Sequence, residues 1–214
     1  MNRGEDAQLS ILVAEGPSAS GKTTWCREHF PQGFVEETAE TMQAPSPYAE
    51  PRDVAAFWVE RNIQRWQAAL ELEKRASIAV CDSDPLKLYF SWALWKAGAQ
   101  DSTLFEIEAP LYRKAIEERR IGFADCVVWL EAPADELRRR AKADATRQRK
   151  RHELYLEMVP WMNAWFGARE RVLPGCAREW SAAPRLRELE GVPSNPRRYD
   201  ATVLDELLAV CGWR

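Results

Sequence analysis

Eight residues near the amino terminus, Gly16 to Thr23 (GPSASGKT), have the types and spacing of the G-x-x-x-x-G-K-[ST] pattern, between an apolar run and a helical pattern. Small residues let successive backbone N–H groups curve around a phosphate, and the start of a helix adds partial positive charge. Lys22 would reach the β- and γ-phosphates of a nucleotide, and Thr23 would ligate Mg²⁺. The pattern therefore predicts a nucleotide phosphate-binding loop.

The residues expected to contact the nucleotide are the loop and the start of the helix after it. They are Gly16, Pro17, Ser18, Ala19, Ser20, Gly21, Lys22, Thr23 and Thr24.

Carboxylates follow two further apolar runs that read as strands. Glu36 and Glu37 lie at the end of one run, and Asp82 directly follows the other. Parallel strands deliver their carboxyl ends to one edge of a sheet, where ligands bind. A carboxylate there can accept a proton from a hydroxyl, and another can anchor Mg²⁺ through water. We expect Glu36, which comes first, to be the base with Glu37 as the alternative, and Asp82 to hold the metal with Thr23. Asp84 is expected to cap the next helix.

Basic residues are concentrated in residues 138–152, where eight of them accompany a single acidic residue. An arginine-rich lid can close over a nucleotide and place positive charge on the phosphoryl group that is transferred. Arg147, Arg149 and Arg151 alternate and are the candidate lid residues. A solvated helix face and a nucleic-acid contact are the alternatives. The formal net charge of −3 disfavours nucleic acid.

Apolar runs and helical patterns alternate along the chain. Strands are expected at Leu9–Ala14, Gly33–Glu36, Ser77–Cys81 and Cys126–Leu130, with a less regular one in Arg171–Trp180. Helices are expected from Lys22, Asp53 and Pro133, and over Leu86–Ala97, Thr103–Ile121, Glu153–Phe166 and Ala201–Val210. Such alternation predicts right-handed crossovers and a parallel sheet covered on both faces. We predict an α/β, three-layer P-loop NTPase fold with a central sheet of about five strands and an arginine-rich lid, in one domain over residues 1–214.

Bulk properties indicate an ordinary globular chain. Of 214 residues, 46% are hydrophobic and 29% are charged, which excludes an extended disordered protein. The five cysteines form no C-x-x-C pair, which fits a reducing compartment. The polar start lacks the apolar core of a signal peptide, and no apolar run reaches the roughly 18–20 residues that span a bilayer. We expect a soluble, cytoplasmic protein without membrane contact.

Two segments resemble known kinases. Glu15 and Gly16 before the loop, with GKTT closing it, resemble the deoxynucleoside and thymidylate kinases, and PSASGKTT is similar to the loop of uridine kinases. The segment RQRKRHELYLEMVPWMNAWF (residues 147–166) is similar to the lid and following helix of deoxynucleoside kinases. There are two departures. Ala19 stands where the first two families usually carry Gly, and Ser83 stands where they place an Arg that holds the acceptor. Arg61, on the long helix, is the candidate for the missing charge.

Together, the residues and the resemblance predict an enzyme that transfers a phosphoryl group from ATP, with Mg²⁺, to a hydroxyl or phosphate of a small molecule. A nucleoside or nucleotide is the favoured acceptor. An antibiotic, a sugar nucleotide or a polynucleotide 5′ end would keep the chemistry and change the acceptor. A non-catalytic nucleotide switch or sensor is a different class. A GTP switch usually needs an N-K-x-D element, which no asparagine of the chain begins.

The sequence leaves several points open: the acceptor, the choice between ATP and GTP, and whether the protein is a homodimer. It also does not tell which aromatic residues line the site. Trp58, Trp66 and Tyr89 are candidates to stack on a base, although packing in the core is the usual role of such residues.

Overall fold

The computed structural model describes residues 10–37, 44–46, 48–130, 132–144, 151–180 and 192–213, without the side chains of 177–180. Within them, four parallel strands form a sheet in the order β2–β1–β3–β4. The strands are β1 (Ser10–Glu15), β2 (Ile78–Asp82), β3 (Cys126–Leu130) and β4 (Ala177–Trp180). From β1 the chain adds strands first on one side and then on the other. The order reverses at β1, and a parallel sheet binds ligands at the carboxyl ends beside such a reversal.

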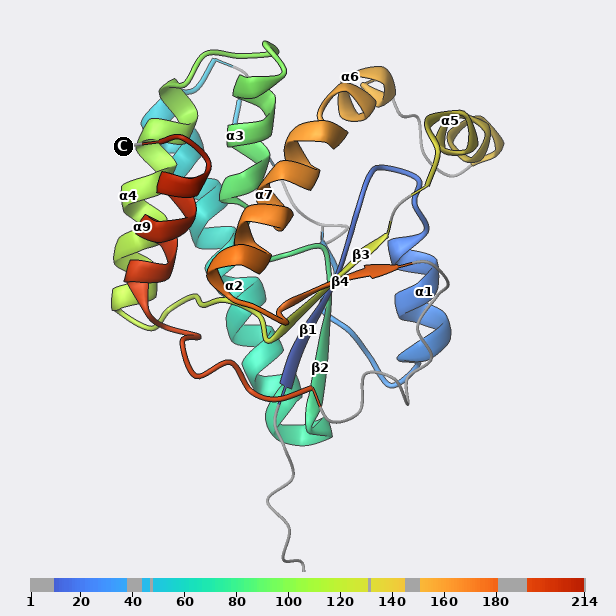
Figure 1. The fold of residues 1–214 in the computed structure, drawn as a ribbon, viewed down its shortest axis with the longest axis vertical. Helices are drawn as coiled ribbons and strands as arrows, with labels where there is room; N and C mark the ends of the chain where they lie inside the picture. Colours follow the sequence, from blue (N-terminus) through green and yellow to red (C-terminus); the bar gives the residue numbers. More distant parts are fainter. Residues whose placement is uncertain are drawn as a thin grey trace, which may run out of the picture.

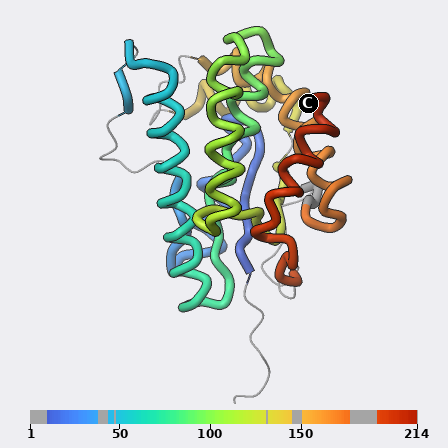
Figure 2. Tube along the Cα trace, turned by 90° about the vertical axis from the view of Figure 1, so that its left-hand side faces the viewer, coloured from blue at the N-terminus to red at the C-terminus, as the bar shows by residue number. Residues whose placement is uncertain are grey.

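Helices cover both faces of this sheet. They are α1 (Lys22–His29), α2 (Pro51–Ala76), α3 (Leu88–Lys96), α4 (Thr103–Glu117), α5 (Ala134–Ala143), α6 (His152–Glu157), α7 (Val159–Val172) and α9 (Ala201–Val210). In Figure 1, α2, α3, α4, α7 and α9 lie on one side of the sheet and α1 on the other. Figure 2 shows α2, α4 and α9 side by side in the thicker layer.

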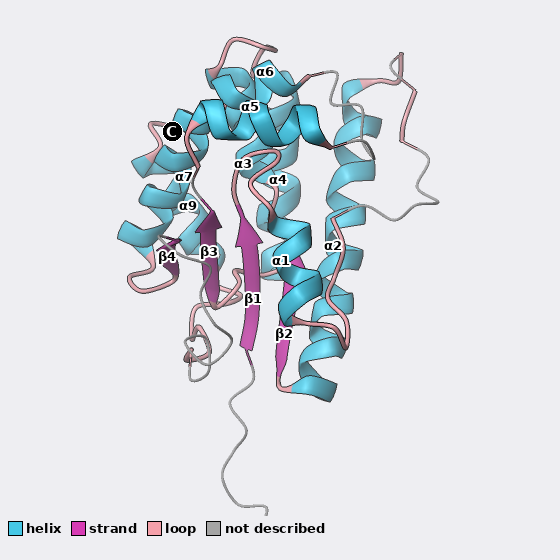
Figure 3. Ribbon diagram, turned by 90° about the vertical axis from the view of Figure 1, so that its right-hand side faces the viewer, coloured by secondary structure: helices cyan, strands magenta, loops and turns pink. Residues whose placement is uncertain are grey.

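The alternation of side chains along β1 divides the core in two. Ile11 and Val13 face the large cluster beneath the thicker helical layer. Leu12 and Ala14 face a smaller cluster that includes Trp25 of α1. Both sets of side chains are fully buried, as expected for a strand covered on two faces. In Figure 3, α5 and α6 lie across the carboxyl ends of the strands. These two helices therefore cover the edge of the sheet at which a parallel sheet would bind a ligand.

The sheet has four strands in the described part of the chain, so the expectation of about five was wrong. The predicted strand Gly33–Glu36 contributes a single parallel bridge, between Val35 and Cys81. Gly33 has a φ of 128°, a conformation that strands do not contain, and the chain becomes extended only after it. The bridge still places the residues that follow beside the end of β2.

Two predicted helices also differ from the observed ones, one by being divided and the other by ending earlier. The predicted helix Glu153–Phe166 is two helices, α6 and α7, that meet at Met158. Pro160 lies in the first turn of α7 and has no backbone N–H, which favours a new helix start there. The predicted helix Thr103–Ile121 ends at Glu117, just before Arg119 takes a φ of 56°. None of the helices in the described part has the length and apolarity needed to cross a bilayer.

Candidate active site

The predicted phosphate-binding loop lies between β1 and α1, which is the position that the sequence predicted. Gly16 has a φ of 149°, and a Cβ atom there would lie 2.4 Å from the carbonyl oxygen of Leu130, so only glycine fits. Ala19 has a φ of 70°, which is unusual for a residue with a side chain. This explains why related loops carry glycine at that place. The strain at Ala19 costs about 1 kcal/mol.

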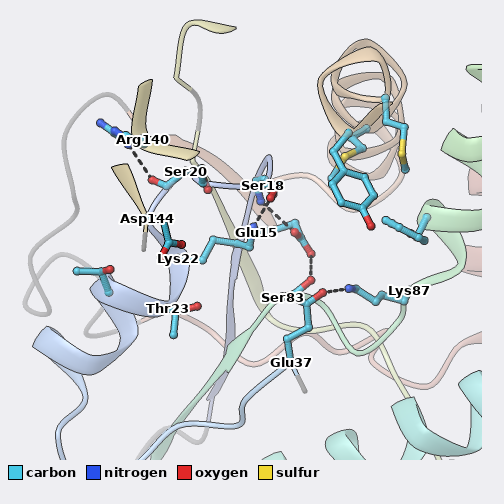
Figure 4. Close-up of a pocket in the computed structure, with 18 of the residues that line it drawn as sticks. Glu15, Ser18, Ser20, Lys22, Thr23, Glu37, Ser83, Lys87, Arg140 and Asp144 are labelled. Carbon is cyan, nitrogen blue, oxygen red and sulfur yellow. Dashed lines mark hydrogen bonds and ion pairs between the residues drawn. The ribbon is translucent and has the colours of Figure 1, made fainter. Parts of the chain in front are cut away.

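A cavity of about 1030 Å³ opens over this loop at the carboxyl ends of the strands. Figure 4 shows loop residues, strand-end carboxylates and α5 around it. The predicted site residues that line it are Gly16, Ser18, Ala19, Ser20, Gly21, Lys22, Thr23, Thr24, Glu37 and Arg151. Pro17, Glu36 and Asp82 do not line it, and Arg147 and Arg149 lie outside the described residues.

Lys22 lies across the loop. Its Nζ atom donates to the carbonyl oxygens of Gly16, at 2.7 Å, and Pro17, at 3.0 Å. The ammonium therefore lies beside the backbone that would surround a phosphate. A lysine in this place can add its charge to that of the loop N–H groups.

Asp82 and Thr23 form the candidate metal site. Thr23 Oγ1 donates to Asp82 Oδ2 at 2.6 Å, whereas the other oxygen of Asp82 is buried and has no hydrogen-bond partner among the described residues. Burial raises the pKa of Asp82, and the hydrogen bond from Thr23 opposes that shift. Nucleotide enzymes hold Mg²⁺ with one or two oxygen ligands, water and substrate phosphates. A hydroxyl and an unsatisfied carboxylate oxygen fit that ion.

Glu15, at the end of β1, is the centre of a buried hydrogen-bond network. Its Oε2 atom accepts from Ser83 Oγ at 2.8 Å, Asp84 N at 2.8 Å and the Tyr89 hydroxyl at 2.6 Å. Its Oε1 atom accepts from the amide of Gly16 at 3.0 Å. Burial, followed by the charges of Glu15 and Glu37, raises the pKa of Tyr89 well above its ordinary value. The phenol therefore remains a donor, and Glu15 ties the loop to the turn after β2.

Glu37 and Glu36 point to different places. The Glu37 side chain lines the cavity and forms an ion pair with Lys87 (Figure 4), whereas Glu36 is exposed and lines a separate cleft of about 420 Å³. Burial raises the pKa of Glu37, but Lys87 and then Lys22 outweigh it and bring it to about 2. Glu37 is therefore an ionised carboxylate beside the phosphate loop. Sequence reasoning missed Lys87 because the pair joins residues far apart in the chain.

Arg65 of α2 is a further residue of the site that the sequence did not predict. It is only 2% exposed, and its Nη2 atom donates to the carbonyl oxygens of Asp82, at 2.7 Å, and Ser83, at 2.6 Å. Its Nε atom donates to the carbonyl oxygen of Glu36 at 3.1 Å. One guanidinium thus holds together the two chain segments that carry the candidate base and the candidate metal carboxylate. The signal was weak, because Arg65 is one of several arginines in the long helix α2 and its neighbours in sequence do not mark it as buried.

The described part of the arginine run divides between two roles. Arg140 Nη1 donates to the carbonyl oxygen of Ser20 at 3.1 Å, which attaches α5 to the phosphate loop. Arg151 lines the cavity. Arg138 and Arg139 instead form exposed ion pairs with acids of α5 and α6, as a solvated helix face does.

An apolar wall closes the side of the cavity away from the loop. It consists of Tyr89, Phe90, Tyr155, Met158 and Met162. The rings of Phe90 and Tyr155 lie 6.1 Å apart at 50° to each other. Among the described residues that line the cavity there is no tryptophan. The tryptophan candidates are absent from this wall, whereas Tyr89 is part of it. The partly exposed rings of Phe90 and Tyr155, backed by the buried Tyr89, Met158 and Met162, offer a surface on which a planar group can stack.

No protein-family model and no curated protein sequence matches the chain. Solved structures do match it. Deoxyadenosine kinase from M. mycoides with bound dATP gives a TM-score of 0.54 at 14% identity, over 83% of this chain and 94% of that one. The same enzyme with bound dCTP gives 0.54 at 15% identity, and with dCMP and dCDP it gives 0.52 at 13% identity. Both comparisons cover 83% of this chain and 93% of the other. At such identities the likeness shows the fold, and the resemblance to the deoxynucleoside kinase group is confirmed at that level.

Proposed function

We propose that this protein is a kinase that transfers the γ-phosphoryl group of ATP to a hydroxyl of a nucleoside. The observation that carries the proposal is that the phosphate loop and the Glu37 carboxylate line the same cavity, beneath an apolar wall. Phosphoryl transfer needs a phosphate cradle, a metal anchor and a group that orients the attacking hydroxyl. The residues for all three lie at one edge of the sheet.

Each residue has one task in this proposal. Lys22 and the loop N–H groups bind the donor phosphates, and Thr23 and Asp82 hold Mg²⁺, which supplies positive charge for the phosphates when bound. Glu37, rather than Glu36, accepts the proton of the attacking hydroxyl, because only Glu37 lines the cavity. Arg151, with Arg147 and Arg149, belongs to a lid over residues 138–152 that closes on the donor.

Charge and shape favour an uncharged nucleoside over a nucleotide as acceptor. Among the described residues that line the cavity, Lys87 is the cation on the turn after β2, and its charge is paired with Glu37. An acceptor phosphate would compete with the Glu37 carboxylate for that ammonium, whereas an uncharged nucleoside would not. A nucleobase can stack on the wall that contains Phe90 and Tyr155. The fold neighbours are deoxyadenosine kinase structures with bound nucleotides, which supports the same class.

The wider proposal is a single kinase domain over residues 1–214 that acts on small molecules and does not bind nucleic acid. The five cysteines all lie in the described residues and form no disulfide, which supports a reducing, cytoplasmic location.

The test is ADP release, with product mass measured, over a panel of nucleosides, nucleoside monophosphates, antibiotics and sugar nucleotides. We expect nucleosides to gain one phosphoryl group, and Lys22→Ala to lower the rate at least ~10³-fold, because the lysine charge is lost where negative charge concentrates. The matched control is Lys74→Ala, an exposed lysine of α2 paired with Glu71. Phosphorylation of compounds of another class in the panel, with no nucleoside phosphorylated, would refute the nucleoside assignment. ATP binding without any product would refute the kinase.

A further inference from the structure

The turn after β2 lacks the arginine that resembling kinases use to hold the acceptor, and Ser83 does not replace it. Ser83 is 1% exposed, and its hydroxyl donates to Glu15 at 2.8 Å. Arg61, the candidate from sequence, lines the separate cleft that contains Glu36. Neither residue therefore offers a positive charge to an acceptor in this cavity.

The next position in the cavity wall that carries a positive charge is Lys87, at the start of α3. The cations among the described lining residues are Lys22, Arg27, Lys87, Arg140 and Arg151. Lys22 and Arg27 belong to α1, and Arg140 is attached to the loop carbonyl of Ser20. Arg151 precedes α6 on the lid side. Lys87 alone in this set lies on the turn after β2 and pairs with Glu37.

The backbone that carries Lys87 is held firmly in place. The amide of Asp84 donates to Glu15, and Asp84 Oδ1 accepts from the amide of Leu86 at 2.9 Å. Asp84 Oδ2 accepts from Arg169 of α7 at 2.5 Å, in an ion pair whose side chains are 1% and 2% exposed. The turn is therefore bonded to β1 on one side and to α7 on the other. Such support orients Lys87 before any ligand arrives.

We propose that Lys87 is the acceptor-binding cation of this kinase, and that it takes over from position 83 the role of the arginine. The inference rests on the proposed function. A lysine ammonium has three N–H donors. One stays on the Glu37 carboxylate and another donates to the acceptor hydroxyl oxygen, so that the hydroxyl proton points at Glu37.

The transfer step then balances. The acceptor oxygen forms a bond to the γ-phosphorus as the bond from that phosphorus to the β,γ-bridging oxygen breaks, and ADP leaves with that electron pair. The acceptor proton passes to Glu37. Lys87 gains and loses no proton, and its charge stabilises the negative charge that grows on the acceptor oxygen. Lys87 therefore contributes to acceptor binding and to turnover, but not to ATP binding.

The experiment measures kcat and KM for the nucleoside, and KM for ATP, in wild type, Lys87→Met and Lys87→Arg. Lys114→Met is the matched control, because Lys114 is a 70% exposed lysine of α4. A hydrogen bond from a charged group accounts for about 10–100-fold. We therefore expect Lys87→Met to raise the nucleoside KM at least ~10-fold and lower kcat by a similar factor, with ATP KM within about twofold. Lys87→Arg should restore most of the loss, because it keeps the charge.

Three results would overturn the inference. The first is a nucleoside KM and kcat in Lys87→Met within about twofold of wild type. The second is an equal rise of both KM values, which marks a general structural role. The third is a Lys87→Arg variant that folds, by its melting temperature, and is as impaired as Lys87→Met. If wild type phosphorylates nothing in the panel, the proposed function itself fails, and this outcome differs from the other three.

Discussion

Thr23 of α1 donates a hydrogen bond to Asp82 of β2, with 2.6 Å between the threonine Oγ1 and the aspartate Oδ2. The hydroxyl thereby orients the carboxylate, and the second oxygen of Asp82 stays unsatisfied in the described part of the molecule. The hydrogen bond already orients the pair, and each oxygen is a ligand type that the proposed Mg²⁺ prefers.

Asp82→Asn should therefore weaken the use of Mg²⁺ and leave metal-free nucleotide binding intact. We expect kcat to fall about 100-fold and the half-maximal MgCl₂ concentration to rise about tenfold, since a charged ligand is replaced by a neutral one. Turnover against MgCl₂ concentration and calorimetric binding of ATP with and without Mg²⁺ measure both effects. Asp53→Asn, at the start of α2, is the control. An unchanged MgCl₂ curve in Asp82→Asn would remove the residue from the metal site.

Glu37→Gln and Glu36→Gln form a matched pair of adjacent substitutions. Glu37 lines the cavity and Glu36 does not, so only the first should affect transfer. We expect Glu37→Gln to lower kcat by ~10²–10⁴-fold, the usual contribution of a positioned base, and Glu36→Gln to leave it within about twofold. Steady-state kinetics with nucleoside and ATP distinguish the two. Equal losses in both variants would contradict the assignment of Glu37.

The pH dependence of transfer should change when Lys87 is replaced. Glu37 must be ionised, and its pKa is about 2, since Lys87 and Lys22 outweigh burial. Glu37 therefore causes no loss of activity as the pH falls from 8 to about 4.5 in wild type. In Lys87→Met, burial still raises the pKa while Lys22 and Arg65 alone lower it, so protonation begins at higher pH. We expect kcat/KM of the variant to fall at a pH where wild type remains level, in profiles from pH 4.5 to 8.

Glu108 of α4 should make folding stability depend on pH. It is 5% exposed, accepts a hydrogen bond from Ser91, and burial raises its pKa to about 7. A raised pKa in the folded state means that stability is fully present below the unfolded pKa of about 4.5 and decreases as the pH rises through 7. The loss is on the order of 3 kcal/mol.

Glu108→Gln removes this contribution because the amide does not ionise. Urea denaturation at pH 4.5 and pH 8 gives the change in the free energy of unfolding between the two pH values for each protein. The contribution of Glu108 is the change in wild type minus the change in the variant. We expect the variant to lose less free energy of unfolding than wild type between the two pH values. An equal loss in both proteins would show that folding does not raise the pKa of Glu108.

The parts of the site that could be predicted from sequence are those specified by local patterns. The loop between β1 and α1 is one, because its residue types and spacing are contiguous. Asp82 is another, because a buried strand directly precedes it. Glu37 could not be separated from Glu36, since their segment joins the sheet only through the Val35–Cys81 bridge and no strand register orients the side chains that follow. The predicted strand Gly33–Glu36 failed for the same reason, whereas the less regular strand expected in Arg171–Trp180 is present as β4.

Residues held by contacts from distant segments could not be predicted at all. The pair of Lys87 with Glu37 and the bonds of Arg65 to Glu36 and Asp82 exist only once α2, β2 and the segment after α1 are assembled. Arg65 also resembles an ordinary member of a long helix when only its neighbours in sequence are visible. Tertiary contacts, rather than propensity or spacing, decide such roles.

Arg65 positions the candidate groups for transfer without help from the apolar wall of the cavity. Arg65 of α2 bonds to the backbone carbonyls of Glu36 and Asp82, and none of its hydrogen bonds in the described part of the chain goes to Tyr155, Met158 or Met162. Substitutions in those three residues can reshape the space for an acceptor without moving the groups that perform the transfer. In the proposed kinase, the choice of acceptor is therefore open to change, by evolution or in the laboratory, independently of the groups assigned to the transfer.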